Sequence, residues 1–200
     1  MHPARVFEEA DPARLRALVA ARGLALIVAA GPDGPAVAHA PVLLGGRTLR
    51  FHLSAANALC PILSGRPRAL AVVTGPDAYV SPDWYAAADQ VPTWNYLSVE
   101  AQGPVRVLKR AETIALLDDL AVHFEAGLAP KPPWTRAKMS PARFEAMLDA
   151  IVGYEMRVER LAGISKLSQN KPQGEIARVA ARLAERSDDG ARALAALMAP

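Results

Sequence analysis

The sequence predicts an α+β fold, an antiparallel β-barrel with inserted helices and a helical C-terminal extension. Three apolar runs of strand length follow one another across short turns, and such short connections cannot make parallel crossovers. Helical patterns lie between groups of strands instead of following every strand, which favours a barrel over an alternating α/β fold. No GxGxxG motif follows the first strand and no Walker A loop is present, so a Rossmann or P-loop fold is disfavoured.

The composition indicates a single domain without cross-links. The chain has 200 residues, one cysteine and four histidines, which excludes a disulfide framework and a Cys/His zinc cluster. We expect no metal, and one domain with a barrel over residues 1–170 and a helical extension over residues 171–200. No apolar run approaches the roughly 18 residues of a membrane helix, and no signal-peptide stretch is visible, so we expect a cytoplasmic protein without membrane contact.

The first third of the chain predicts a helix followed by a three-stranded meander. Asp11 and Pro12 supply an N-cap and a first-turn proline, and Gly23 follows the last helical position. Turn residues separate the next three apolar runs, so we expect strands at residues 24–30, 37–44 and 47–53.

The middle of the chain is expected to extend the sheet. A helical turn near residues 57–63 leads into two strand pieces at residues 69–74 and 78–81. Residues 93–107 alternate between apolar and polar side chains but are interrupted by a Gly-Pro pair. This segment is therefore either two strands or one strongly bent strand.

Two helices are expected next, each with one apolar face. The first covers residues 111–126, with helical spacing of Ile114, Leu117, Leu120 and Phe124. The second begins at Ser140 and Pro141, and its apolar face comprises Phe144, Met147, Leu148 and Ile151.

The last part of the chain predicts a final strand and a helical tail. Residues 152–161 alternate apolar with charged side chains, which is typical of a half-buried strand. Residues 166–171 are expected to be irregular. Residues 175–198 are expected to form an amphipathic helix that is broken at positions 188–190.

Five of the seven Trp and Tyr residues lie between positions 77 and 96, namely Tyr79, Trp84, Tyr85, Trp94 and Tyr96. Each ring joins a large apolar surface to a hydrogen-bonding group, so the cluster suits a site that stacks and orients a flat ligand. The alternative is a set of aromatic side chains that closes the end of a sheet.

A polar run near the C-terminus is a second candidate for binding. It offers one cation, one hydroxyl and two amides, from Lys166, Ser168, Gln169 and Asn170. Such groups suit an anion or the edge of a heterocycle. The alternative is a solvated loop in which Asn170 and Pro172 cap the following helix.

Other reactive side chains give weaker signals. His39 and His52 fall on neighbouring predicted strands, where each is either a satisfied structural histidine or a group that bonds a cofactor. Cys60 follows an apolar residue and is expected to be a small buried hydrophobe. No pattern indicates a catalytic acid, base or nucleophile, so the sequence leaves enzymatic activity open.

Five strings of the sequence together resemble those of a known family: FEEADPARLRALVAA, VAHAPVLL, AYVSPDWY, VPTWNY and KLSQN. The family is that of the PaiB-type FMN-binding negative transcriptional regulators, and the resemblance runs from about residue 1 to residue 185. It implies a flavin-binding split β-barrel, related to pyridoxamine-phosphate-oxidase-like proteins. It also implies a homodimer with the flavin at the subunit interface.

The function that this resemblance implies is a negative transcriptional regulator or a flavin-dependent sensor. Two alternatives stay open, a small flavin-dependent oxidoreductase of unknown substrate and a dimeric protein that has lost flavin binding. The net charge of +3 is modest, and the sequence shows neither a recognition helix nor a basic stripe. DNA as a direct partner therefore has no visible motif behind it.

The resemblance also implies which residues bind FMN. Aromatic rings would flank the isoalloxazine, amides would read its pyrimidine edge, and a lysine or serine would hold the phosphate. The matching positions are His39, His52, Asn57, Tyr79, Ser81, Trp84, Tyr85, Trp94, Asn95, Tyr96, Lys166, Ser168, Gln169 and Asn170.

The chain departs from the family pattern after its third predicted strand. Relatives commonly have H-V-A-[RK]-A-N-P-x-W, whereas this chain reads HLSAANALC. Ala55 thus replaces a basic residue, Ala58 a proline and Cys60 a tryptophan, and Phe51 stands where a glycine commonly precedes the histidine. Loss of a cation beside a phosphate removes a charge-assisted contact of roughly 1.5–3 kcal/mol, so this departure weakens the expectation of FMN binding.

Overall fold

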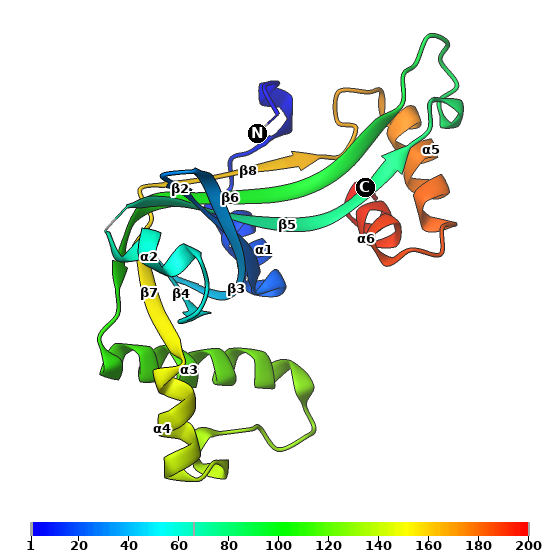
Figure 1. Cartoon of the computed structure of the whole chain (residues 1–200). Helices are drawn as coiled ribbons and strands as arrows, with labels where there is room; N and C mark the ends of the chain where they lie inside the picture. The colour runs from blue at the N-terminus through cyan, green and yellow to red at the C-terminus, as the bar shows by residue number, and fades with distance from the viewer. Residues whose placement is uncertain (1, 66, 200) are drawn as a thin grey trace. The chain divides into compact units, whose positions relative to one another are not determined.

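The computed structural model describes residues 2–65 and 67–199 (Figure 1). Its strands are β1 (Glu8–Glu9), β2 (Leu24–Gly31), β3 (Gly34–Gly45), β4 (Thr48–Ser54), β5 (Arg68–Val80), β6 (Thr93–Val107), β7 (Ile151–Arg157) and β8 (Arg160–Lys166). Their order in the sheet is β1-β8-β6-β5-β2-β3-β4-β7, and a further pairing of β6 with β7 closes six of them into a ring. The predicted antiparallel α+β barrel is confirmed.

The α-helices lie between strands and after the last strand. They are α1 (Pro12–Arg22), α2 (Leu59–Ser64), α3 (Arg110–Glu125), α4 (Pro141–Asp149), α5 (Gln173–Ala184) and α6 (Asp189–Met198). Two of the short 3-10 turns matter below, η1 (Arg5–Phe7) and η2 (Pro82–Trp84). Among the described residues, no helix is both long enough and apolar enough to span a bilayer.

The chain divides into two compact units. The barrel unit comprises Val19–Val73 and Glu100–Leu161, and the terminal unit comprises Met1–Leu18, Thr74–Val99 and Ala162–Pro200. Strands β5, β6 and β8 each contribute residues to both units.

Alternating side chains form the core of the barrel unit. Leu49, Phe51 and Leu53 of β4 are at most 3% exposed, while the residues between them are only partly buried. Phe51 lies opposite Tyr154 of β7 in the antiparallel register, and the two rings stack with centroids 5.4 Å apart. The alternation follows from the two-residue period of a strand, which turns every second side chain to one face.

Helices α5 and α6 lie side by side in the terminal unit (Figure 1). Val179, Leu183 and Leu194 are fully buried in a cluster with Val80 of β5 and Tyr85 after η2. The tail helix is interrupted as predicted, but at residues 185–188 and not at 188–190, because α5 ends at Ala184 and α6 begins at Asp189. Asp188 caps α6 by accepting a hydrogen bond from the Ala191 amide at 2.8 Å.

The predictions for the first third of the chain are confirmed. Helix α1 follows Asp11, whose carboxylate accepts a hydrogen bond from the Ala13 amide at 2.8 Å. Strands β2, β3 and β4 pair antiparallel. The turns between them contain Gly34 at φ 121° and Gly46 at φ 55°, a backbone region that favours glycine.

Strands β5 and β6 each run without a break. The pieces expected at residues 69–74 and 78–81 form the single strand β5, and of the two alternatives for residues 93–107 the single strand is correct. A Cβ at Gly103 would lie 1.8 Å from the carbonyl oxygen of Arg157. The glycine that interrupts the sequence pattern therefore permits a close approach of β6 to the end of β7.

The single strand expected at residues 152–161 is wrong. The structure has two strands in this region, β7 and β8, and β8 ends at Lys166. Residues 167–171 belong to no helix or strand, as expected for the irregular segment 166–171 apart from its first residue. Gly163 in the middle of β8 looks like a strand breaker in the sequence. A Cβ there would lie 2.3 Å from Cδ2 of Leu15, so the glycine makes room for α1 inside the terminal unit.

The buried faces of α3 and α4 also differ from the predicted ones. The buried residues of α3 are Thr113, Leu116 and Leu120, whereas Phe124 is 41% exposed. On α4, Leu148 is buried, Met147 is 50% exposed, and Ile151 already belongs to β7. Helical spacing predicted the two helices correctly. More than one set of apolar residues can form the buried face of each helix, and the face that packs in the structure differs from the predicted one.

Candidate functional site

A cavity of about 290 Å³ in the terminal unit brings together five of the predicted site residues. They are Tyr85, Asn95, Lys166, Ser168 and Asn170. The other residues that line it are His2, Phe7, Val91, Thr93 and Lys171. The lining joins η1, the segment from η2 to β6, and the loop between β8 and α5. We call it the lysine cavity.

Asn95 and Ser168 form the buried part of this lining. Asn95 is fully buried and Ser168 is 2% exposed. The Asn95 amide donates to the Ser168 hydroxyl at 3.0 Å and to the sulfur of Met198 at 3.6 Å. Ser168 has a left-handed φ of 61°, which a non-glycine residue keeps only where its surroundings impose it. The bonded pair therefore anchors the loop between β8 and α5.

Two lysines supply the charge of the lysine cavity. Lys166 Nζ donates to Thr93 Oγ1 at 2.5 Å and lies 5.6 Å from the centroid of the Phe7 ring. Lys171 Nζ donates to Gln90 Oε1 at 2.5 Å and lies 5.2 Å from the Tyr85 centroid. Each ammonium thus has a neutral oxygen and an aromatic face as neighbours.

The lysines have no anionic partner within residues 2–65 and 67–199. Neither forms an ion pair there, and the lining of the cavity contains no Asp or Glu. Burial without a compensating carboxylate lowers the pKa of Lys166. The cavity therefore has a positive electrostatic potential that an anionic ligand would neutralise.

Glu175 of α5 fixes the chain that runs from η2 to β6. Its carboxylate accepts hydrogen bonds from the amides of Ala86 and Ala87 at 2.9–3.1 Å. Arg178, one turn further along α5, donates to the Trp84 carbonyl at 3.3 Å. The segment that carries Tyr85 and Val91 is thereby tied to the tail of the chain.

The structure separates the five clustered aromatic residues into two groups. Tyr85 is buried in the apolar cluster of α5 and α6 and also lines the lysine cavity, and Trp84 packs against the same cluster. Tyr79 and Trp94 are 38% and 53% exposed and meet edge to face with centroids 6.1 Å apart. Tyr96 is half-buried. The exposed pair keeps free ring surface, as a stacking site requires.

Gln169 and Ser81 serve their own segments and do not line the lysine cavity. The Gln169 amide accepts from Leu167 N at 2.7 Å and donates to the Ser165 carbonyl at 2.5 Å. Ser81 accepts a hydrogen bond from the Asp83 amide at 3.3 Å and caps η2. The capping alternative for Asn170 is wrong, because Pro172 occupies the N-cap of α5.

The remaining predicted residues belong to the barrel unit. His39 is exposed on β3. Nδ1 of His52 on β4 is buried without a hydrogen-bond partner among the described residues, and burial lowers the pKa of this histidine. Asn57 precedes α2, and its side-chain oxygen accepts a hydrogen bond from the Leu59 amide at 2.9 Å. Cys60 is buried, as the sequence predicts.

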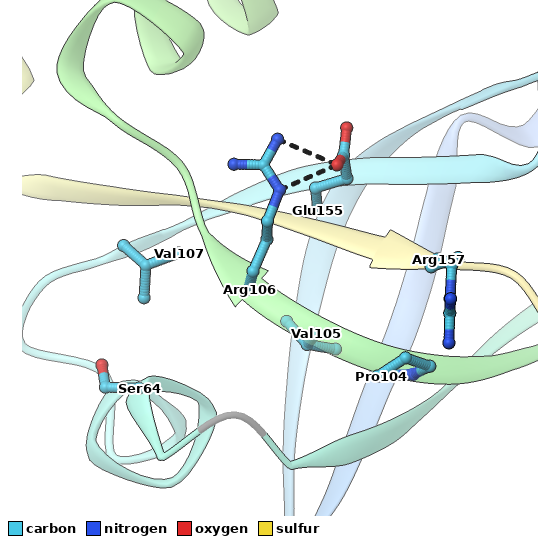
Figure 2. Close-up of a pocket in the computed structure, with 7 residues that line it drawn as sticks. All are labelled: Ser64, Pro104, Val105, Arg106, Val107, Glu155 and Arg157. Atoms are coloured by element: carbon cyan, nitrogen blue, oxygen red, sulfur yellow. Dashed lines mark hydrogen bonds and ion pairs between the residues drawn. The ribbon is translucent and has the colours of Figure 1, made fainter.

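The barrel unit has a larger cavity, of about 670 Å³ (Figure 2). Its lining residues are Ser64, Pro104, Val105, Arg106, Val107, Glu155 and Arg157. Figure 2 shows Arg106 of β6 reaching to Glu155, its register partner on β7. Nε of Arg106 donates a hydrogen bond of 2.9 Å to this carboxylate. We call it the arginine groove.

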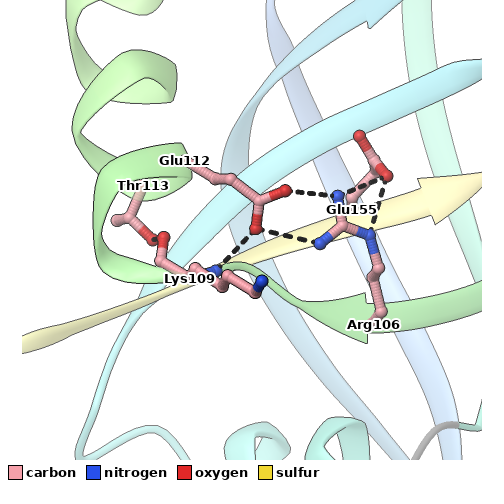
Figure 3. A network of polar contacts seen from close by, with 5 residues as sticks. All are labelled: Arg106, Lys109, Glu112, Thr113 and Glu155. Carbon is pink, nitrogen blue, oxygen red and sulfur yellow. Dashed lines mark hydrogen bonds and ion pairs between the residues drawn. The ribbon is translucent and has the colours of Figure 1, made fainter.

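Arg106 is saturated with carboxylate partners. Besides Glu155 it binds Glu112 of α3 with two hydrogen bonds of 2.8 and 3.0 Å (Figure 3). Glu112 also accepts a hydrogen bond from the Lys109 amide at 2.7 Å. The hydrogen bond from Arg106 is the largest cause that lowers the pKa of Glu112, to about 2. This arginine therefore has little charge left for a ligand.

Comparison with known proteins identifies the family. A family model described as "Putative FMN-binding domain" matches residues 1–160. The chain belongs to this family. A relative in Bacillus subtilis (strain 168), "Protease synthase and sporulation protein PAI 2", is 33% identical over 129 residues, or 64% of this chain and 61% of that protein. The chain thus spans less than two thirds of the relative's length. The resemblance seen in the sequence is confirmed.

Solved structures show the same fold for this member of the FMN-binding family. The FAD and heme binding protein from Mycobacterium smegmatis has a TM-score of 0.62 at 18% identity, covering 85% of this chain and 78% of that one. Conserved hypothetical protein Rv2991 from Mycobacterium tuberculosis has a TM-score of 0.62 at 13% identity, covering 86% and 94%. The predicted split barrel is confirmed.

The residues of the lysine cavity fit a cofactor such as FMN in chemical type. Lysines, hydroxyls and amides suit a phosphate or a heterocycle edge, and two aromatic rings add apolar surface. The connection after β4 fits less well, because Ala55 offers no side-chain donor and the side-chain oxygen of Asn57 already accepts a hydrogen bond from the Leu59 amide. Among the described residues, no group of three His, Cys, Asp or Glu could hold a metal ion.

Sequence reasoning missed Lys171 as a site residue. Its only signal was its position directly after the KLSQN run. His2 gave no signal, and Phe7 only began the string FEEADPARLRALVAA; both join the cavity through the path of the N-terminal segment. Thr93 precedes the aromatic pair of β6 and could have been included as a neighbour of Trp94.

Proposed function

We propose that this chain binds FMN and acts as a cytoplasmic homodimer. The observation that carries the proposal is the lysine cavity, in which residues expected from the family resemblance meet a lining without carboxylates. The mycobacterial protein of similar fold is described as FAD and heme binding. This description supports a flavin as the class of ligand, although the two sequences are only 18% identical.

Within the proposed site the side chains have separate tasks. Ser168, Asn170 and the lysines bind polar and charged groups of the cofactor, and Asn95 keeps Ser168 in place. Tyr79 and Trp94 do not line the lysine cavity, and Trp94 lies on the opposite face of β6 from Thr93 and Asn95. Their exposed rings are therefore a separate surface on which a flat ring can stack. A bound flavin would supply reversible electron uptake, and the chain's own residues would bind and orient it.

The test is an absorbance spectrum of the purified protein before and after addition of FMN. We expect flavin absorbance or a saturable thermal shift with added FMN. Denaturation of the protein should release the bound compound, and mass analysis should identify it as FMN. Protein that lacks flavin absorbance and shows no thermal shift with FMN would overturn the proposal. It would favour the alternative that the chain has lost flavin binding.

The homodimer is tested separately, by light scattering of the purified protein. We expect the mass of two chains, and a lower dissociation constant of the dimer when FMN is present if both copies contact the flavin. A monomer that binds one FMN would show that the site is complete within one chain and would contradict the shared site.

We further propose that the flavin protein regulates transcription or senses redox state, on the strength of the PaiB-type resemblance. A mobility-shift assay on the DNA upstream of its own gene tests direct regulation, and we expect binding that weakens steeply with salt. Absence of DNA binding even at low salt would contradict direct regulation. Steady consumption of NAD(P)H by the FMN-loaded protein would instead favour the oxidoreductase alternative.

A further inference from the structure

The barrel unit buries a tyrosine hydroxyl that has no hydrogen-bond partner among the described residues. It belongs to Tyr154 of β7, which is fully buried and stacks on Phe51. An unpaired hydroxyl in an apolar core costs free energy, because it has lost its contacts with water and no protein group replaces them. The core therefore holds a donor that lacks an acceptor.

Two polar side chains of α2 lie beside this hydroxyl, without the geometry of a hydrogen bond. They are the Cys60 thiol and the Ser64 hydroxyl, and both affect the acidity of Tyr154. Burial raises the pKa of Tyr154, the thiol raises it further, and the Ser64 hydroxyl lowers it. The phenol is therefore protonated at neutral pH and can donate a hydrogen bond.

The backbone holds the Cys60 thiol in place. Its Sγ donates to the Ser54 carbonyl at 3.2 Å, and the Cys60 carbonyl accepts a hydrogen bond from the Ser64 hydroxyl at 2.9 Å. Cys60 is 6% exposed, and the chain has no second cysteine. Oxidation of this sulfur therefore cannot end in a disulfide within the chain.

We propose that Cys60 and Tyr154 form a peroxide-reactive site, in which the thiol is oxidised to a sulfenic acid and the Tyr154 hydroxyl donates a hydrogen bond to the new oxygen. The sulfur forms a bond to one peroxide oxygen while the oxygen–oxygen bond breaks, and the second oxygen leaves as water with the thiol proton. The sulfur loses the two electrons that the peroxide gains. This site goes beyond the proposed function, because it needs no flavin.

The surroundings of Cys60 favour an oxidation that stops at the sulfenic acid. The added oxygen gives the Tyr154 hydroxyl the acceptor that it lacks, so oxidation satisfies a buried donor. A sulfenic acid is commonly consumed by condensation with a second thiol. The chain offers no second thiol, and burial of Cys60 hinders the approach of a thiol from another protein.

The arginine groove gives a small oxidant a path toward Cys60. Ser64 lines this groove and lies one helical turn from Cys60 on α2 (Figure 2). Arg157, another lining residue, is 69% exposed, so the groove meets solvent there. Hydrogen peroxide is little larger than water and carries no charge. It can therefore enter the groove without displacing a carboxylate from Arg106.

The experiment oxidises the full chain with hydrogen peroxide in the dark, where a bound flavin generates no oxidant of its own. Catalase then removes the peroxide, and the protein is unfolded in the presence of dimedone, which traps sulfenic acids. Mass analysis of the peptide that contains Cys60 measures the thiol, the trapped sulfenic acid and the higher oxidation states. We expect sulfenic acid as the main product of the folded protein. Protein unfolded in urea before oxidation should give mainly sulfinic and sulfonic acids.

Tyr154→Phe tests the hydroxyl, because it keeps the ring that stacks on Phe51. Without the donor, the yield of trapped sulfenic acid should fall roughly fivefold to tenfold, the effect of one hydrogen bond. Thr113→Val is the matched control. It removes another buried hydroxyl of the barrel unit, which donates to the Lys109 carbonyl at 3.2 Å. Its yield of sulfenic acid should equal that of the wild type.

Thermal unfolding gives a second measurement of the same contact. Oxidation should change the melting temperature more favourably in the wild type than in Tyr154→Phe, where the new buried oxygen has no donor. Circular dichroism checks that each variant folds. If Tyr154→Phe does not fold, the comparison of folded with unfolded wild type still tests the site.

Each outcome decides for or against the site. Sulfenic acid that forms in the folded wild type and decreases in Tyr154→Phe would support it. A Cys60 thiol that survives peroxide in the folded protein would overturn it, as would direct passage to sulfinic or sulfonic acid. Equal yields in the wild type and Tyr154→Phe would also overturn it. None of these results depends on FMN binding, so the proposed function is tested separately.

Discussion

The lysine cavity and the arginine groove both contain cations, but only one of them has charge to offer a ligand. In the groove, Arg106 already bonds Glu112 and Glu155. In the cavity, Lys166 and Lys171 bond neutral oxygens and no carboxylate lines the wall. The groove has the larger volume, about 670 Å³ against about 290 Å³.

The comparison shows that the volume of a cavity does not by itself indicate the binding site. An arginine between two carboxylates is an internal structural contact, and a ligand anion would have to displace one of them. A lysine with only neutral neighbours gains a full ionic partner when an anion arrives. We therefore place the candidate site in the smaller cavity, and the predictions below test this contrast.

The strongest test removes the buried support of the lysine cavity. Asn95→Ala should lower the free energy of unfolding by about 2–4 kcal/mol, because it leaves a buried void and deprives the Ser168 hydroxyl of its partner. Urea denaturation measures the loss. Gln169→Ala is the neighbouring control, with an expected loss of at most about 1 kcal/mol because Gln169 is exposed. Equal losses in the two variants would show that the buried pair has no special role.

A smaller effect is expected where α5 holds the segment between η2 and β6. Glu175→Ala removes the acceptor of the Ala86 and Ala87 amides and should cost about 1–2 kcal/mol of unfolding free energy. Limited proteolysis should then cleave this segment faster. Glu185→Ala, which removes only an exposed pair with Arg182, is the control. Unchanged cleavage in Glu175→Ala would mean that other contacts hold the segment.

The arginine groove should respond weakly to loss of its cation. Arg106→Met is expected to lower the free energy of unfolding by about 0–1 kcal/mol, because the side chain is nearly half exposed. Its FMN affinity should equal that of the wild type, in contrast to Lys171→Met. A large loss of FMN affinity in Arg106→Met would reverse our assignment and move the site to the barrel unit.

The smallest expected effect is a pH dependence in the groove. Arg106 lowers the pKa of Glu112 from 4.5 to about 2. The folded state therefore binds this proton less readily than the unfolded state, so the stabilisation is complete above pH 4.5 and is lost as the pH falls toward 2. Glu112→Gln should have a flatter stability profile across that window in urea denaturation. A profile parallel to the wild type would show that the pair does not contribute.

Local sequence signals predicted much of the fold and part of the site. The caps around α1, the turns between β2, β3 and β4, and the alternation of β7 follow from residues that are near one another in the chain. The strands that contain Gly103 and Gly163 were harder to predict. A Cβ at either glycine would collide with Arg157 or Leu15, and these residues are distant in sequence. A glycine that permits close packing looks the same in a sequence as one that ends a strand.

Three features follow from the residues alone: the groups available for binding, the antiparallel order of the first strands and the family resemblance. Packing selects which aromatic rings are buried and which face of α3 is covered, and it brings Lys171 and Lys166 into one cavity. The physical reason is that a side chain's charge and ring are properties of the residue. Whether the charge is already neutralised, or the ring already covered, depends on partners that folding brings from elsewhere in the chain.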